Sequence, residues 1–183
     1  MKITKTQLRQ IIKEEIQKLN EISYGDIIGQ VNDKDLTSLK GAPKTIKGDF
    51  YCHKNKLKSL EGAPETVGGN FACWNNKLTS LKGAPRSIGG YFDCERNDLT
   101  SLKGSPQKVG DYFNCMQNKL TSLKGAPKSV GGNFECDRNN LTSLEGAPKS
   151  VGGNFSCDWN DKDFTEEEVR AVCKVKGKVF VNS

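Results

Sequence analysis

The chain has 183 residues, of which 34% are hydrophobic, 8% aromatic and 27% charged, and its formal net charge is +6. No apolar run reaches the ~18 residues that cross a membrane, and the N-terminal apolar stretch contains charges and lacks a small-residue cleavage site. We therefore expect neither a membrane span nor a secretory signal. The thin apolar content, the 19 glycines and the seven cysteines indicate an unusual architecture.

Residues 1–22 are predicted to form a separate amphipathic helix, because Leu8, Ile12, Ile16 and Leu19 recur at spacings of three and four. Three roles remain open for this helix: packing onto the first coil of the repeat region at 36–161, acting as an adaptor or targeting peptide, or lying on a membrane surface. Residues 23–35 are predicted to form an N-terminal cap strand, with Val31 in its apolar run.

A repeat of 21 residues fills 36–161 in six uninterrupted copies, and all six prolines of the chain fall in one of its columns. A short, fixed period of this kind predicts a solenoid of stacked coils. The apolar columns of one coil are then buried only against the neighbouring coils. This explains how a chain with so few apolar residues can form a core.

Each copy contains a Phe-x-Cys segment, which predicts a strand whose Phe and Cys point inward and whose neighbours point outward. We expect one parallel strand per coil, in register with the next, and a mostly β fold with irregular turns. Two leucine columns and an Ile/Val column are predicted to point inward. The Asn three residues after each Cys is placed to bond the backbone of adjacent coils, and the Gly pairs are expected to let the chain bend into the strand.

Residues 162–183 are predicted to form a helix-strand cap. The sequence from Thr165 to Glu168 is typical of a capping box, and it opens a short helix that includes Val169, Val172 and Cys173. The segment 175–181 then has the apolar spacing of 151–157, which predicts a final strand that closes the sheet.

The segment Phe134-x-Cys136-x-x-Asn139-x-Leu141 resembles the L-x-L-x-x-N-x-L core of leucine-rich repeats. The short Pro-bearing remainder is similar to the compact bacterial and phage type of that family, and the resemblance covers residues 36–161. It implies a leucine-rich-repeat-like stack. One departure is Gly131, which stands where the family usually has a leucine three residues before the strand. The curvature of the family therefore does not carry over, and no helices are expected on the convex side.

The segment from Met1 to Glu21 resembles N-terminal segments on proteins of large tailed phages. The tripeptides 19–21 and 12–14 are similar to the aliphatic-x-Glu sites at which prohead proteases of such phages cut capsid-targeting peptides. This resemblance implies an alternative function as a structural or packaged phage-type component that is addressed by its N-terminal peptide. The mature chain would then begin at Ile22.

The cysteine column favours packing over chemistry. In-register side chains lie ~4.8 Å apart and parallel, whereas a disulfide needs converging Cβ atoms ~3.8 Å apart and zinc needs tetrahedral ligands. We therefore expect buried, reduced thiols, no metal or other cofactor, and a cytoplasmic location, or a virion-associated one if the chain is phage-encoded. Cys173 lies outside the repeat column and is predicted to pack in the cap. His53 has no nucleophile–base–acid set around it, so we expect no enzyme activity.

Two basic columns lie on the turn side, with Glu61, Glu65 and Glu145 interrupting them. The columns consist of Lys40, Lys82, Lys103 and Lys124, and of Lys44, Arg86, Lys128 and Lys149. Their lack of aromatic residues favours a role in solubility over nucleic-acid binding. A basic nucleic-acid-associated module is the remaining alternative function.

The outward positions around Phe and Cys vary most from coil to coil, which favours a role in binding another protein. The aromatic residues gather in the first four coils, and the last coils are acidic. A basic element of the partner is expected over Glu135, Asp137 and Asp158. An idle surface is the alternative, and the sequence names neither the partner nor an oligomeric state. The predicted partner-binding residues are Tyr51, His53, Trp74, Tyr91, Glu95, Tyr112, Met116, Glu135 and Asp137.

Overall fold

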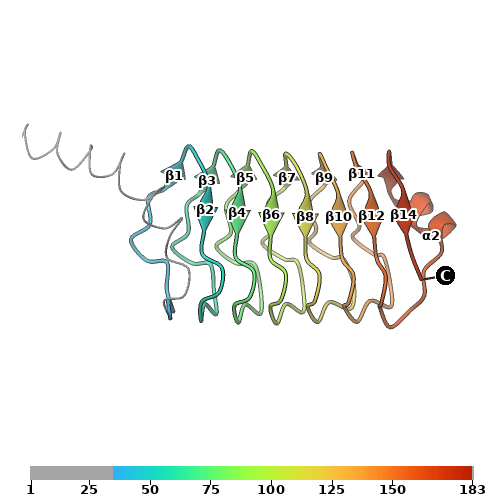
Figure 1. Cartoon of the computed structure of the whole chain (residues 1–183), viewed down its shortest axis with the longest axis horizontal. Helices are drawn as coiled ribbons and strands as arrows, with labels where there is room; N and C mark the ends of the chain where they lie inside the picture. The colour runs from blue at the N-terminus through green and yellow to red at the C-terminus, as the bar shows by residue number, and fades with distance from the viewer. Residues whose placement is uncertain (1–34, 183) are drawn as a thin grey trace, which may run out of the picture.

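A computed structural model describes residues 35–182 of the chain. These residues form a parallel β-solenoid in which the coils follow one another along the long axis, with one short helix near the C-terminus (Figure 1). The predicted N-terminal helix at 1–22 and all but the last residue of the predicted cap strand at 23–35 lie outside the described residues.

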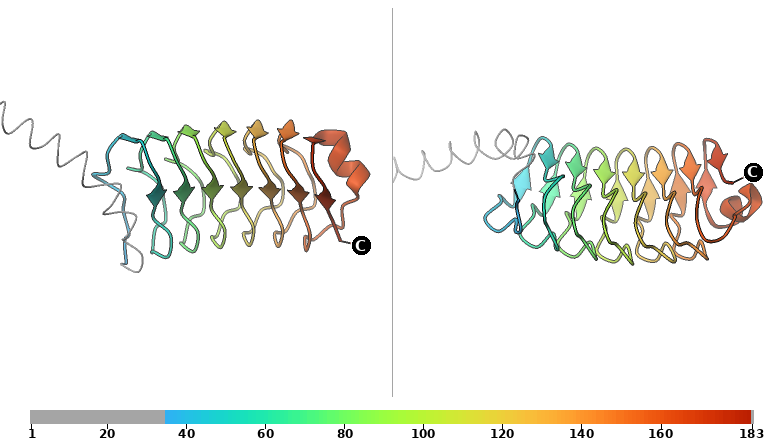
Figure 2. Two further views of the ribbon diagram at one scale, coloured as in Figure 1. Left: turned by 45° about the horizontal axis from the view of Figure 1, so that its top comes forward. Right: turned by 60° about the horizontal axis from the view of Figure 1, so that its bottom comes forward.

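Each coil contributes two short strands, so the solenoid has two seven-stranded parallel sheets that run along it as two rows (Figure 2). The odd-numbered strands form the first sheet: β1 (Thr45–Ile46), β3 (Thr66–Val67), β5 (Ser87–Ile88), β7 (Lys108–Val109), β9 (Ser129–Val130), β11 (Ser150–Val151) and β13 (Lys174–Val175). The even-numbered strands form the second sheet: β2 (Phe50–Tyr51), β4 (Phe71–Ala72), β6 (Phe92–Asp93), β8 (Phe113–Asn114), β10 (Phe134–Glu135), β12 (Phe155–Ser156) and β14 (Val179–Phe180).

The prediction of one strand per coil is therefore wrong in number, although the predicted parallel stacking is confirmed. The Ile/Val column points inward as expected, but the residue before it pairs with its equivalent in the next coil and forms the extra sheet. Thr45 pairs with Thr66 and Phe50 with Phe71, so both sheets keep the 21-residue register.

The core is a set of side-chain columns along the solenoid axis. The six repeat phenylalanines are fully buried, and the ring centroids of consecutive phenylalanines lie 5.1 to 5.5 Å apart. The repeat cysteines are buried beside them, as are the leucine and Ile/Val columns, apart from the half-buried Leu36 at the first coil. The inward orientation predicted for Phe, Cys, Leu and Ile/Val is confirmed. Burial against neighbouring coils supplies the apolar contact that a single coil lacks.

The asparagine column links the backbones of successive coils. Asn97 Nδ2 donates to the carbonyl oxygens of Cys73 in the preceding coil and Cys94 in its own, both at 3.1 Å, and its Oδ1 accepts the N–H of Leu78 at 3.0 Å. Asn76, Asn118 and Asn139 make the same three bonds in their coils, which confirms the predicted role. A buried amide thereby pairs backbone groups that the strand ladder leaves unpaired.

The Gly pairs lie in the bend between the two strands of each coil, as expected, and they also allow close approach between coils. A Cβ atom on Gly89 would lie 2.0 Å from the carbonyl oxygen of Gly68 in the preceding coil, a distance that no side chain can occupy. Left-handed backbone falls on the glycine of the Gly-Ala-Pro turn, for example Gly83 with φ of 90°, and on the residue two positions after each repeat cysteine, for example Arg96 with φ of 52°.

The C-terminal cap has the predicted helix and final strand. Helix α2 (Glu166–Val172) begins with a capping box in which the Thr165 side chain accepts from the backbone of Glu168 and the Glu168 side chain accepts from the backbone of Thr165. Val169 and Cys173 are buried, whereas Val172 is exposed. Strands β13 and β14 extend the two sheets, with Val151 opposite Val175 and Phe155 opposite Val179.

Candidate binding surface

The outward side of the even-numbered strands, which we call the outward strand face, contains all nine predicted partner-binding residues. They occupy three columns, namely the positions before Phe, between Phe and Cys, and after Cys. Each of the nine is at least half covered by its lateral neighbours, and Asp137 is buried. The face is therefore a packed side-chain layer, in which each residue is held by its equivalents in adjacent coils.

Aromatic rings stack on the N-terminal half of this face. The ring centroids of His53 and Trp74 lie 4.4 Å apart and those of Tyr91 and Tyr112 lie 4.5 Å apart, with interplanar angles of 6° and 12°. Tyr51 is tilted against His53 at 6.0 Å. The stacking follows from the strand register, because residues 21 apart occupy the same column on neighbouring strands. His53 thus belongs to an aromatic cluster.

Tyr91 and Tyr112 remain protonated over the physiological pH range. Burial raises the pKa of Tyr112 to about 12, and the nearby carboxylates of Asp93 and Glu135 add to the effect. Burial also raises the pKa of Tyr91, with further contributions from Tyr51 and Tyr112. These two phenol groups therefore offer neutral hydrogen-bonding tips on stacked aromatic rings.

Five carboxylates occupy the middle and C-terminal half of the face: Asp93, Glu95, Glu135, Asp137 and Asp158. Burial raises the pKa of Asp93 to about 6, and the negative charges of Glu95 and Glu135 act in the same direction. Burial raises the pKa of Glu135 and Asp158 as well, and the charge of Asp137 adds to both. The carboxylates thus repel one another in a partly dehydrated layer.

Few cationic side chains pair with these carboxylates. Within residues 35–182, Arg96 is the one cation paired with any of them, with its Nε 3.3 Å from Glu95 Oε1. Asp137 Oδ1 is instead held by neutral groups, accepting the Ser156 hydroxyl at 2.5 Å and the Asp158 N–H at 2.6 Å. These hydrogen bonds fix the geometry of the acidic end of the face and leave its charge uncompensated.

A hollow of about 330 Å³ opens at the acidic end of the face. Met116 and Phe180 supply apolar walls, while Glu135 and Asp137 supply the carboxylates. An arrangement of apolar walls around carboxylates suits the side chain of a lysine or arginine, whose stem is apolar and whose head is cationic.

Sequence reasoning missed two exposed aromatic residues at the C-terminal end of the solenoid. The side chain of Trp159 is 70% exposed and that of Phe180 is 45% exposed, which makes them the most exposed aromatic residues of the described chain. Phe180 lies on β14 in the column of Glu135 and Ser156. Trp159 stands in a column that otherwise holds Lys, Asn, Arg and Gln, and that difference in the repeat was the available signal.

Three of the eight basic residues in the turn-side columns pair with the glutamates that interrupt these columns. Lys82 Nζ lies 2.6 Å from Glu61 Oε1, and Lys124 Nζ lies 2.9 Å from Glu145 Oε2. Lys44 pairs more loosely with Glu65, at 3.6 Å. Each pair joins neighbouring coils across an exposed surface, so it contributes little to stability.

The cysteines are free thiols in the core, as predicted. Burial raises the pKa of the column thiols well above the ordinary range and raises that of Cys173 to about 11. A buried neutral thiol is neither a good nucleophile nor a metal ligand. In the described part of the chain, no cluster of three or more His, Cys, Asp or Glu side chains is arranged to hold a metal ion.

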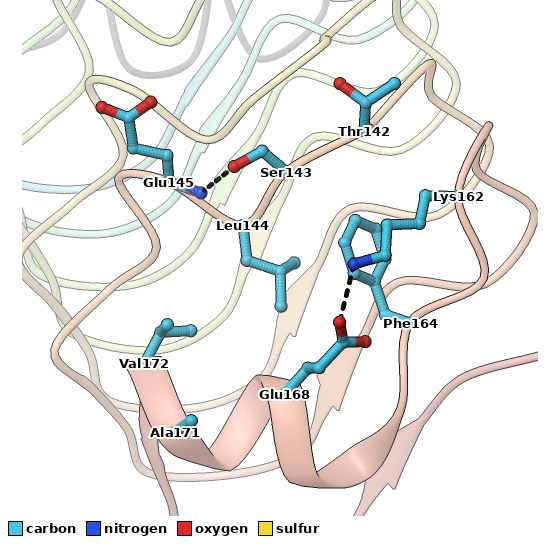
Figure 3. Close-up of a pocket in the computed structure, with 9 residues that line it drawn as sticks. All are labelled: Thr142, Ser143, Leu144, Glu145, Lys162, Phe164, Glu168, Ala171 and Val172. Atoms are coloured by element: carbon cyan, nitrogen blue, oxygen red, sulfur yellow. Dashed lines mark hydrogen bonds and ion pairs between the residues drawn. The ribbon is translucent and has the colours of Figure 1, made fainter.

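A second hollow, of about 440 Å³, lies between the last repeat and helix α2 (Figure 3). Leu144 and Phe164 form its apolar part, and Lys162 Nζ bridges to Glu168 Oε1 at 2.6 Å beside them. It is the place where the next coil of the solenoid would stack, and the helix covers it only partly. We assign it to the end of the core rather than to the outward strand face.

No family model, curated protein or solved structure matches this chain. Between residues 35 and 182, no helix is long and apolar enough to cross a membrane.

Proposed function

We propose that the protein is a non-enzymatic scaffold that binds another protein through the outward strand face. The observation that carries this proposal is the presence, on one sheet, of a stacked aromatic cluster and a hollow lined by two carboxylates, Glu135 and Asp137. Aromatic residues and methionine are enriched in the cores of protein interfaces. We also propose that the repeats are related to leucine-rich repeats, which their sequence resembles.

The packing of the face favours binding without large entropic cost. Trp74 is already stacked on His53 and covered by Lys54, whose Nζ lies 5.2 Å from the ring centroid of Trp74, so it loses little rotamer freedom when a partner arrives. Tyr91 and Tyr112 are held in the same way. A surface that is ordered before binding keeps more of its contact energy.

The charge of the face points to the chemistry of the partner. Burial raises the pKa of Glu135 and the charge of Asp137 adds to the effect, so a cationic side chain near the two carboxylates would relieve this repulsion. Trp159 and Phe180 would add apolar contacts at the same end. The proposed footprint therefore extends along the whole face, beyond the N-terminal half that the aromatic residues alone suggest.

The experiment is affinity capture with the immobilised full chain, in which captured proteins are identified by mass spectrometry. The test variant combines Trp74→Ala with Tyr112→Ala. The control combines Thr79→Ala with Thr121→Ala, two exposed positions outside the face. We expect a partner that binds the wild type and the control and is lost from the test variant, while circular dichroism shows both folded. Equal capture by both variants would contradict the proposal.

A further inference from the structure

The outward side of the odd-numbered strands differs in character from the outward strand face. Its column runs through small hydroxyl residues at Thr45, Thr66 and Ser87 and then changes at the C-terminal half. From β7 to β13 the order is Lys108, Ser129, Ser150 and Lys174. This second sheet was not predicted from the sequence, and none of the predicted partner-binding residues lies on it.

A groove of about 460 Å³ runs across these last strands. Lys108, Lys174 and Lys176 line it together with Ser129 and Ser150, and the glycine backbone forms part of the lining. At these glycines the backbones of neighbouring coils approach closely, because a Cβ on Gly131 would lie 2.0 Å from the carbonyl oxygen of Gly110.

The groove is strongly basic. Within residues 35–182, none of its three lysines pairs with a carboxylate, and the exposed Lys128 and Lys149 lie next to its serines in the chain. Asp111, which follows Gly110, is the one acidic residue adjacent in sequence to the lining. The turn-side lysines Lys44, Lys82 and Lys124, by contrast, have glutamate partners.

The free donors of the groove are side-chain groups. The backbone N–H of Gly131 bonds Val109 O at 3.0 Å and that of Gly152 bonds Val130 O at 2.9 Å, so the strand ladder uses them. Neither Ser129 nor Ser150 donates its hydroxyl to any group of the described chain. Ammonium groups at the two ends and hydroxyls between them suit a ligand that carries several separated oxyanions.

We propose that this groove binds an extended acidic peptide segment of a partner protein. Lys108 and Lys174 are three strand spacings apart, or ~14 Å between their Cα atoms. Four residues of extended peptide span about the same length, and alternate side chains point to one side. Carboxylates at positions i and i+4 would reach the end lysines, while the residue at i+2 meets the serine hydroxyls.

An acidic peptide fits the groove better than nucleic acid does. Single strands are held by aromatic side chains on which bases stack, and no aromatic residue lines the groove. Sequence-independent duplex binding relies on many phosphate contacts spread over a larger surface. Nucleic acid is therefore an outcome of the test that would overturn the assignment.

The experiment measures fluorescence anisotropy of a labelled peptide that alternates glutamate and serine, titrated with the full chain at low and at physiological salt. A peptide with glutamine in place of glutamate controls for charge. The test variant combines Lys108→Gln, Lys174→Gln and Lys176→Gln. The control combines Lys58→Gln, Lys77→Gln and Lys103→Gln, three exposed lysines outside the groove, and has the same net charge.

We expect the groove variant to bind the glutamate peptide about tenfold more weakly than the wild type and the control variant to change affinity by less than about twofold. Absence of binding by the wild type, equal losses in both variants, or equal binding of the glutamine peptide would overturn the proposal. Tighter binding of duplex DNA that is lost only in the groove variant would assign the groove to nucleic acid instead. Because neither peptide nor variants involve the outward strand face, failure here leaves the proposed function standing.

Discussion

Asp93 holds a carboxylate in the middle of the outward strand face, and we expect its replacement by asparagine to stabilise the folded chain at neutral pH. Burial raises its pKa to about 6 from the ordinary 3.8, and the charges of Glu95 and Glu135 add to the effect. The folded state therefore binds the proton more tightly than the unfolded state. Stability falls as the pH rises from about 4 to 6, and the loss is complete above about pH 6.

The magnitude follows from the two pKa values. The difference between about 6 and 3.8 corresponds to ~3 kcal/mol, and partial exposure of the side chain reduces the gain expected for Asp93→Asn at neutral pH to ~1–2 kcal/mol. The substitution keeps the local geometry. Asp93 Oδ1 accepts the Glu95 N–H at 3.0 Å, and Asn114 Oδ1 accepts the Met116 N–H at 3.0 Å in the same column of the next coil.

Urea unfolding followed by circular dichroism, at neutral pH and near pH 4, measures this effect. We expect Asp93→Asn to raise the transition midpoint at neutral pH and to differ little from the wild type near pH 4. Asn114→Asp is the matched reverse change and should lower the midpoint at neutral pH. The reasoning is refuted if Asp93→Asn brings no gain at neutral pH, or if the gain persists undiminished near pH 4.

Three further predictions concern the scaffold. Asn97→Ala should lower the free energy of unfolding by ~2–4 kcal/mol, because it leaves buried backbone groups unpaired. The control Asn140→Ala, at an exposed position, should change the urea midpoint little. Equal effects of the two variants would contradict a stabilising role of the asparagine column. Gly89→Ala should lower the thermal midpoint sharply, because its Cβ would clash with the carbonyl oxygen of Gly68. Gly48→Ala should not, because a Cβ at Gly48 would have no atom within 4 Å. Similar midpoints for the two variants would argue against the close approach of neighbouring coils at Gly89. All seven thiols should react with a thiol reagent only slowly in the native protein and fully in denaturant, and a rapid native reaction would show that the cysteine column is accessible.

The repeat made the core predictable at the level of single residues. In a stack without insertions, residues 21 apart must be neighbours, so the burial of Phe92 and Cys94 and the bonding of Asn97 follow from the period and from strand alternation. The capping box at Thr165 was also predictable, because its hydrogen bonds lie within one helical turn and depend only on the local sequence. The same logic placed the nine candidate residues on one face.

Sequence by itself determined which side chains form columns, which columns are buried, and how the solenoid is closed by α2 and β14. Only the tertiary structure decided how far the chain turns between columns, because that angle depends on the packing of whole coils. It therefore revealed the second sheet, whose Lys108 and Lys174 line a groove. The structure also revealed which charges of different columns lie close together, as at Asp93, Glu95 and Glu135. The repeat period determines which residues are neighbours within a column, whereas the distances between columns depend on how the coils pack.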